Sequence, residues 1–183
     1  MTDLFALRII MEYTKAWSLL AHDRKFEAQR GVVQNNIFPL RLDETISNIE
    51  HLKYRLRLSG QADPNFGVRR DDSFAQALEA LEMVDSHGAL VYPNIASRAA
   101  NLFYYIITQK PFVDGNKRIA VFIFLYYLSL NEHLLLSRVH VSFPHTAVVS
   151  MCLLVVESSE DKKEQIIQSL VDLIDLAPVI PGY

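Results

Sequence analysis

The sequence contains few of the features that mark secreted or membrane-spanning proteins. Its 183 residues include a single cysteine, so no disulfide framework can form. Cys152 lies in the apolar run MCLLVV, where we expect a small buried side chain, and a reducing cytoplasm fits this usage. The amino terminus carries Asp3 and no basic region of the kind that opens a signal peptide. We therefore expect a cytoplasmic protein.

Long apolar runs and an excess of basic charge are also missing. The longest apolar run, residues 119–130, contains two tyrosines and is too short to span a bilayer. The formal net charge is −3, whereas nucleic-acid binding usually requires a basic surface. We therefore expect neither a membrane nor a nucleic acid among the partners.

What the chain does have is a hydrophobic content of 50% with 21% charged residues, which is typical of a globular domain. At this length we expect one domain, residues 1–183. Apolar residues recur at helical spacing along most of the chain. Partial alternation indicates a short strand only over residues 134–142. The pattern predicts an all-α protein with helices over residues 3–22, 43–58, 73–84, 94–109, 116–131, 145–157 and 160–176.

Capping and turn residues set the expected helix boundaries. Asp43 and Asn94 are predicted N-caps, and Ser73 with Gln76 fits a capping box. The turn-rich segment SGQADPNFG, residues 59–67, separates the second predicted helix from the main body. The polar sequence SHG is expected to stop the helix that Ser73 opens.

A polar loop, QKPFVDGNKR at residues 109–118, interrupts the most apolar part of the sequence. Pro111 ends the preceding helix, because it lacks an amide hydrogen and also restricts Lys110. Gly115 permits a tight turn and a close approach of a ligand to the backbone. Lys117 and Arg118 add positive charge to the free N–H groups of the next helix start. These features predict an anion site, most naturally for phosphate.

Asp114 would repel a phosphate group unless a cation lies between them. Mg²⁺ commonly bridges a carboxylate and the phosphates of a substrate, so Asp114 is a candidate metal ligand. The alternative is a solvated loop in which Asp114 and Asn116 cap the next helix and both cations are simply exposed. Composition and spacing leave these two interpretations open.

The segment PFVDGNKR resembles the signature loop of the Fic/Doc (Fido) family, whose pattern is H-x-F-x-(D/E)-(G/A)-N-x-R. The match runs from Phe112 to Arg118 and falls between two predicted helices, as the family requires. Three further segments resemble the Fic domains of RhuM-type virulence-associated proteins: FGVRRDDSF (66–74), LVYPNIASRAANLFYYII (90–107) and VVESSEDKKEQIIQSLVDLI (155–174).

The resemblance implies a Fic-fold helical bundle with a central buried helix after the signature loop. Residues 66–176 would form the Fic core, and residues 1–58 an N-terminal helical hairpin of the same domain. Residues 66–73 correspond in position to a small β-flap that aligns a target peptide by strand addition.

The implied activity is transfer of AMP, or of a phosphate in Doc-like members, from Mg-ATP or another nucleoside triphosphate to a hydroxyl of a target protein. Asp114 would hold Mg²⁺, and Gly115 and Asn116 would form the anion hole. Arg118 would bind the distal phosphates, with Lys117 beside them, and Phe112 would anchor the loop. A second copy of the chain or an antitoxin is a further candidate partner.

Two positions depart from the family pattern. Lys110 stands where the family has its His, the general base, and a protonated lysine cannot accept a proton. Val121 stands where many AMP-transferring members carry an Arg, an absence shared with Doc-like proteins. The inhibitory pattern [S/T]-x-x-x-E-[G/N] does not occur in the sequence.

Two functions remain open from the sequence, and a plain helical interaction domain without a ligand ranks behind both, because it would leave DGNKR as a coincidence. The first is a Fic-type transferase weakened by the loss of the motif His. The second is a catalytically inactive Fic-fold module that binds a nucleotide or a partner protein. Six histidines are scattered along the chain, at positions 22, 51, 87, 133, 140 and 145, without metal-ligand spacing. Only His87, which follows a helix that could reach the cleft, is a candidate to replace the missing base.

Overall fold

The computed structural model describes residues 37–131 and 145–175 of the chain. Within these residues the protein is mostly helical and contains no sheet, which confirms the all-α class. None of the helices described is long and apolar enough to cross a membrane. The helix predicted over residues 3–22 and the strand predicted over residues 134–142 lie outside the described residues.

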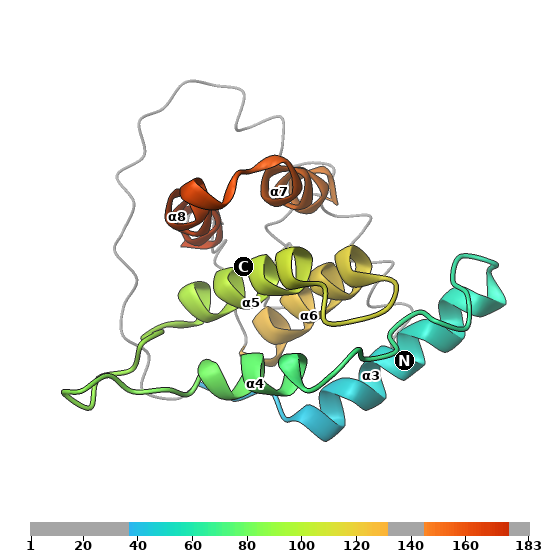
Figure 1. Cartoon of the computed structure of the whole chain (residues 1–183), viewed down its shortest axis with the longest axis horizontal. Helices are drawn as coiled ribbons and strands as arrows, with labels where there is room; N and C mark the ends of the chain where they lie inside the picture. Colours follow the sequence, from blue (N-terminus) through green and yellow to red (C-terminus); the bar gives the residue numbers. More distant parts are fainter. Residues whose placement is uncertain (1–36, 132–144, 176–183) are drawn as a thin grey trace, which may run out of the picture.

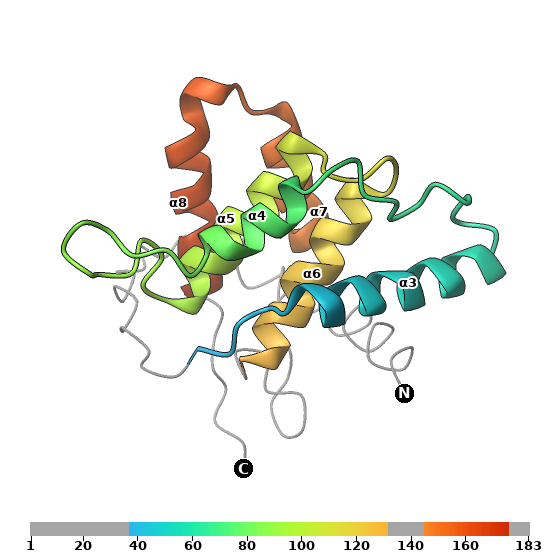
Figure 2. The same ribbon diagram turned by 60° about the horizontal axis from the view of Figure 1, so that its bottom comes forward.

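The helices are arranged in three layers (Figures 1 and 2). Helices α5 and α6 occupy the middle layer, α7 and α8 lie on one side of it, and α3 and α4 lie on the other. A short 3-10 turn, Glu160–Lys162, leads into α8. The bounds are α3 Leu42–Leu58, α4 Ser73–Ala80, α5 Ile95–Gln109, α6 Asn116–Leu130, α7 His145–Glu157 and α8 Lys163–Asp175.

The central pair α5 and α6 forms most of the core. Small side chains such as Ala100 and Ala120 are fully buried, which lets neighbouring helices approach closely. Phe103 of α5 and Phe124 of α6 pack with their ring centroids 5.3 Å apart. Burial of one large apolar side chain contributes about 1.5–3 kcal/mol to the stability of the fold. The packing of several such side chains therefore holds α5 and α6 together. The central buried helix expected after the polar loop is therefore confirmed as α6.

The outer layers attach to this pair through single apolar stripes. Ile49 of α3 is fully buried, and Tyr126 of α6 donates a hydrogen bond of 3.1 Å to Glu44. On the opposite side, Val155 of α7 and Leu170 of α8 are buried against the core. Cys152 is buried as predicted, and burial raises the pKa of its thiol to about 11.

Several helix boundaries agree with the sequence analysis. Asn94 caps α5 as predicted, because its Oδ1 accepts a hydrogen bond of 2.7 Å from the Ser97 amide. In turn, the Ser97 hydroxyl oxygen accepts a hydrogen bond of 3.4 Å from the Asn94 amide. Helix α6 begins at Asn116, and α7 has the predicted bounds. At these positions the capping and turn residues favour the same helix boundary as the tertiary packing, so the sequence predicts the boundary correctly.

Two predicted caps are wrong. Helix α4 begins at Ser73 itself without a side-chain cap; instead the Asp71 carboxylate accepts a hydrogen bond of 2.8 Å from the Ser73 amide. Hydrogen bonds from Ser73 lower the pKa of Asp71. Helix α3 begins at Leu42, so Asp43 lies in the first turn, where a negative charge is favourable, rather than at the N-cap.

The helix predicted to reach residue 84 ends at Ala80, and an irregular hairpin follows it. Val84 and Leu90 pair as an isolated antiparallel bridge. Asp85 shapes the tip, because its Oδ1 accepts hydrogen bonds from the amides of His87 (2.8 Å) and Ala89 (3.0 Å). The hairpin projects from the body of the protein at the far left of Figure 1.

A buried arginine fastens this hairpin to the core. Arg98 of α5 is 2% exposed, its Nη1 lies 2.5 Å from Glu82 Oε1, and its Nε donates to the Tyr92 carbonyl at 3.0 Å. Glu82 and Tyr92 lie on the two arms of the hairpin, so one side chain holds both. Burial raises the pKa of the neighbouring Tyr127 to about 12, and the charge of Arg98 opposes only part of this effect.

We predict that Glu82→Ala lowers the free energy of unfolding by roughly 1–3 kcal/mol, because it leaves the Arg98 guanidinium buried without its carboxylate. The loss is smaller than for a fully buried pair, since the Glu82 side chain is 48% exposed. Urea denaturation measures the change. Glu79→Ala removes the same charge from an exposed position of α4 and should change the value by less than about 0.5 kcal/mol. Equal losses in the two variants would contradict the role of the pair.

Candidate functional site

A buried aromatic side chain anchors the polar loop between α5 and α6 to the core. Lys110 adopts a left-handed conformation with φ 51° and ψ 58° and ends α5. Pro111 and Phe112 then turn into the protein, and the Phe112 ring packs on Phe74 with centroids 4.9 Å apart. The next two residues return to the surface, since Val113 is exposed and Asp114 is half-buried. The loop therefore presents its second half, next to α6, to the solvent.

Asn116 closes this loop with two hydrogen bonds to one residue. Its Oδ1 accepts from the Phe112 amide at 3.0 Å, and its Nδ2 donates to the Phe112 carbonyl at 2.8 Å. The side-chain amide is thereby used to hold the loop, which leaves the Asn116 backbone as its contribution to an anion hole. We call this pair of bonds the Asn116 clamp.

Residues 66–70 lie alongside the loop and hydrogen-bond to it. The Val113 amide donates to the Val68 carbonyl at 2.8 Å, and the Gly67 amide donates to the Asp114 carbonyl at 3.1 Å. Arg70 adds a side-chain bond of 3.0 Å from Nε to the Phe112 carbonyl. This is the segment expected as a β-flap, and in the described structure its pairing with the loop consists of isolated bridges rather than strands.

Gly115 meets two requirements at the start of α6. Its φ is +87°, a conformation that residues with a side chain rarely adopt. A Cβ atom at this position would also overlap the Phe66 ring, which lies against it. Helix α6 has no side-chain cap, so the N–H groups of its first turn and the positive end of its dipole face the loop without a competing side chain.

Arg118 and Asp114 face each other one helical turn apart. Arg118 Nη2 lies 3.4 Å from Asp114 Oδ2, and Arg118 Nη1 donates to the Gln61 carbonyl. The guanidinium also lies 4.7 Å above the centroid of the Phe66 ring. Both charged side chains remain nearly half exposed, so the ion pair is a weak surface contact that a stronger ligand can replace.

The two lysines of the loop differ in their surroundings. Lys117 is exposed on α6, and its positive charge opposes the upward shift of the Cys152 pKa that burial causes. Lys110 is exposed, and no described residue forms a hydrogen bond or ion pair with it. The side chain of Lys110 is therefore available to a ligand at the loop.

A divalent cation could be held here only together with its substrate. Across residues 37–131 and 145–175, no group of three or more His, Cys, Asp or Glu side chains could bind a metal ion by itself. Asp114 is a single half-exposed carboxylate beside an uncapped helix start. One carboxylate with substrate phosphates is a common arrangement for Mg²⁺, so the residues present fit a metal that arrives with a nucleotide.

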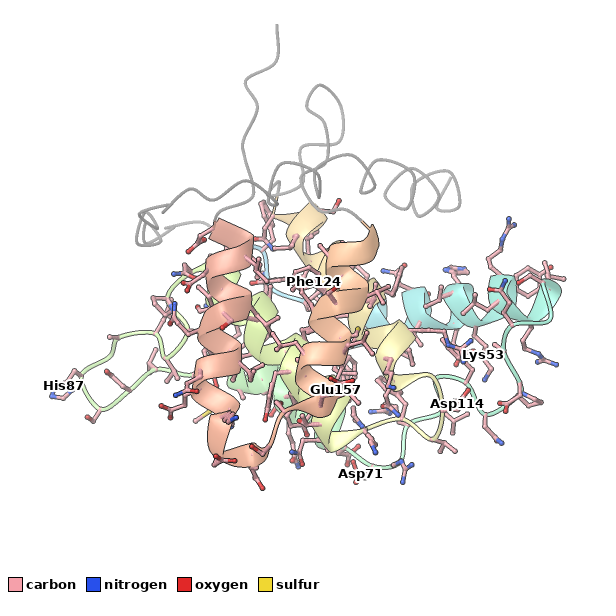
Figure 3. All side chains as sticks on the ribbon, turned by 90° about the horizontal axis from the view of Figure 1, so that it is seen from above. Lys53, Asp71, His87, Asp114, Phe124 and Glu157 are labelled. Carbon is pink, nitrogen blue, oxygen red and sulfur yellow. The ribbon has the colours of Figure 1, made fainter. Side chains whose placement is uncertain are left out.

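No hydrogen bond or ion pair joins a histidine of the described residues to the loop. His87 is at the exposed tip of the hairpin, at the opposite end of the molecule from Asp114 in Figure 3. The suggestion that His87 could replace the missing base is therefore wrong. His51 is exposed on α3, and the other four histidines lie outside the residues whose side chains are described.

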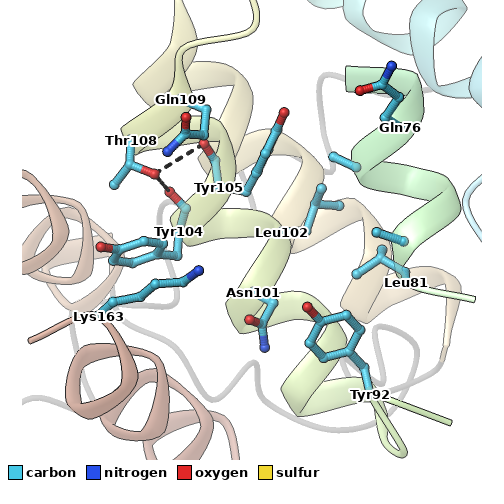
Figure 4. A pocket seen from close by; sticks show the side chains of 12 residues that line it. Gln76, Leu81, Tyr92, Asn101, Leu102, Tyr104, Tyr105, Thr108, Gln109 and Lys163 are labelled. Atoms are coloured by element: carbon cyan, nitrogen blue, oxygen red, sulfur yellow. Dashed lines mark hydrogen bonds between the residues drawn. The ribbon is translucent and has the colours of Figure 1, made fainter. Parts of the chain in front are cut away.

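A groove of about 240 Å³ opens between α4, α5 and α8 (Figure 4). Its walls combine the rings of Tyr92, Tyr104 and Tyr105 with polar side chains from all three helices. Tyr105 also donates a hydrogen bond of 3.1 Å to the Ser73 carbonyl, which joins α5 to the start of α4. One end of the groove reaches Gln109, so it opens next to the signature loop.

The sequence analysis located the loop but missed the residues that hold it. Phe66, Arg70 and Phe74 lie in the segment 66–74 that the family resemblance singled out, but their contacts with the loop were not predicted. The pattern around residue 98 predicted an apolar helix, so the buried Arg98 was also missed. Such contacts depend on how helices pack, which periodicity does not reveal.

Comparisons with known proteins agree with this geometry. Residues 43–128, which include the signature loop and the helices on both sides of it, match the family model described as Fic/DOC family. A search of curated proteins and a search of solved structures found no match. The position of the signature loop between two buried helices and the family match both indicate a Fic/DOC region. The match over residues 43–128 therefore supports the Fic/DOC family for this part of the chain.

Proposed function

We propose that the start of α6 binds the phosphates of Mg-ATP, and that the chain is a Fic-type transferase in which Lys110 limits the transfer step. The observation that carries this proposal is the N-terminus of α6, where no side chain caps the first-turn amides beside Asp114 and Arg118 because the Asn116 side chain bonds to Phe112. The proposed acceptor is a hydroxyl group of a target protein, as in the family.

Phosphate binding follows from the charges at this helix start. The N–H groups of the first turn and the helix dipole favour an anion, and Arg118 adds a full positive charge. Arg118 would exchange its contact with Asp114 for a phosphate. Loss of this ion pair costs little free energy, because an exposed ion pair contributes only about 0–1 kcal/mol to stability. Lys117 and Lys110, both exposed, would add charge at the rim.

Asp114 would hold the Mg²⁺ ion that accompanies the nucleotide. Once Arg118 turns to the phosphates, the Asp114 carboxylate is released to coordinate the cation. When bound, such an ion neutralises charge on the phosphate oxygens. Asp114, Gly115 and Arg118 therefore have compatible roles on one short loop.

The transfer step requires a base that the described residues do not supply. The target hydroxyl would attack the α-phosphorus with loss of pyrophosphate, or the γ-phosphorus with loss of ADP, and its proton must be accepted. Lys110, which stands where the family has its His, is exposed and forms no hydrogen bond or ion pair with a described residue. We infer that Lys110 contacts phosphate and that transfer is slow.

A second candidate is a Fic-fold module that binds a nucleotide or a partner protein without transfer. It is favoured by the surroundings of Lys110, which is exposed and forms no hydrogen bond or ion pair with a described residue, and by the place of His87 at the tip of the hairpin. The likeness to RhuM-type proteins suggests virulence or a toxin–antitoxin pair as the setting, with an antitoxin as the partner. The two candidates share the phosphate site and differ only in the last step.

We predict that Gly115→Ala removes nucleotide binding and lowers the free energy of unfolding by at least about 1–3 kcal/mol, because it combines backbone strain with a clash against Phe66. The shift of the melting temperature on addition of Mg-ATP measures binding. Gly60→Ala is the matched control, since Gly60 has a φ of +71° but no atom within 4 Å of the added Cβ. A normal nucleotide shift in Gly115→Ala would contradict the phosphate site.

We predict that Lys110→His increases transfer at least tenfold, because a positioned general base contributes about 10²–10⁴-fold in rate. Incubation of a lysate with ATP labelled at the α- or γ-phosphate measures the transfer and identifies the group moved. Lys117→His places the same residue elsewhere on the loop and should have no such effect. If neither the unaltered chain nor Lys110→His labels any protein, while both bind Mg-ATP, the binding module is the correct function.

A further inference from the structure

Helix α7 presents an apolar face that no other described helix covers. Val149, Leu153 and Val156 are spaced by four and three residues, so they form one stripe on the helix. Their exposed fractions are 44%, 49% and 44%, and Leu154 on the flank is 39% exposed. We call these four residues the α7 face.

This face differs from the outer face of its neighbour. Helix α8 exposes polar residues such as Gln165, Gln168 and Ser169, as expected for a helix on a protein surface. Before Glu157, its last residue, α7 carries no acidic or basic side chain apart from His145 at its start. Apart from the exposed Ser150, the outer side of α7 is apolar, and a helix of this character is usually covered, which indicates that another element packs on α7.

The chain itself contains a segment of complementary character. Residues 3–22 are predicted to be helical and are apolar at positions 4, 5, 7, 9, 10, 11, 13, 17, 19 and 20. Arg8, Glu12 and Lys15 follow each other at helical spacing and would form one narrow charged stripe. The rest of such a helix would be apolar and would need a partner surface. Neither this apolar part nor the α7 face carries a charged side chain, so docking would bury no unpaired charge.

The connection is long enough for the two to meet. Phe38 is tied to the end of α6, because its amide donates to Asn131 Oδ1 at 2.8 Å and its carbonyl accepts from Asn131 Nδ2 at 3.2 Å. Residues 23–36 can span on the order of 45–50 Å when extended. Helix α7 packs against α6 and is only about 20 Å long, so every part of its face is within reach.

We propose that residues 3–22 form a helix that docks its apolar side on the α7 face. The covalent link favours this occupant over a second copy or another protein, because a tether of this length gives a millimolar effective concentration. Docking removes the exposed valine and leucine side chains from water and completes the layer above α5 and α6. This proposal does not depend on the nucleotide site.

The single tryptophan of the chain, Trp17, lies in the proposed helix and reports on docking. We predict that the fluorescence of the full chain is blue-shifted relative to the denatured chain and weakly quenched by acrylamide. Leu153→Asp and Val149→Asp should each shift the emission to longer wavelength and increase quenching several-fold. Val84→Asp makes the same kind of change at a residue of the hairpin that is 54% exposed, and should leave Trp17 unaffected.

Three outcomes would overturn the proposal: emission of the unaltered chain equal to that of the denatured chain, no response to either α7 variant, or loss of the blue shift on dilution. The last outcome would show that a second copy covers the face. Far-UV circular dichroism checks that the variants remain folded. Hydrogen exchange on the unaltered chain needs no variant: protected amides within residues 3–22 support docking, and unprotected amides throughout the segment overturn it. Binding of Mg-ATP should be unchanged in all variants.

Discussion

The site depends on the Asn116 clamp. Two hydrogen bonds between one side-chain amide and the backbone of Phe112 hold the end of α5 and the start of α6 in one geometry. The Phe112 ring, buried against Phe74, fixes the same residue from the other side. Because the clamp uses the Asn116 side chain within the loop, the amides of the first turn of α6 stay free of a cap. The Asn116 side chain thereby shapes the proposed anion site from within the loop, while the Asn116 backbone amide stays available to a ligand.

The clamp also explains why the loop interrupts the most apolar part of the chain. The positive end of a helix dipole is useful to a ligand only where solvent can reach it, and the exposed Val113 and half-buried Asp114 show that the loop comes to the surface just before α6. Asp114 and Arg118 neutralise each other in the absence of a ligand, which lets both charges stay close together. The proposed site therefore combines a phosphate-binding helix start with a carboxylate that could hold a cation, whereas no base for the transfer step is identified among the described residues.

The sequence predicted the parts of the fold that local signals decide. Pro111 and Gly115 placed the end of α5 and the start of α6 correctly, and Asn94 identified the cap of α5. The sequence failed where a tertiary contact decides. Helix α4 stops at Ala80 because the following residues form a hairpin that the buried Arg98 holds, and one arginine in an apolar helix gives no sign of such a role. The supporting contacts of Phe66 with the loop join residues far apart in the chain, so no local pattern could reveal them.

Nuclear magnetic resonance of the backbone amides during titration with Mg-ATP tests the central claim most directly, because it observes the helix start itself. If the α6 N-terminus binds the phosphates, the largest shifts should occur at the amides of Gly115, Asn116, Lys117 and Arg118, with smaller shifts along residues 66–70. AMP, which lacks the distal phosphates, should shift these amides less. Saturable shifts elsewhere with no change at these four amides would contradict the account.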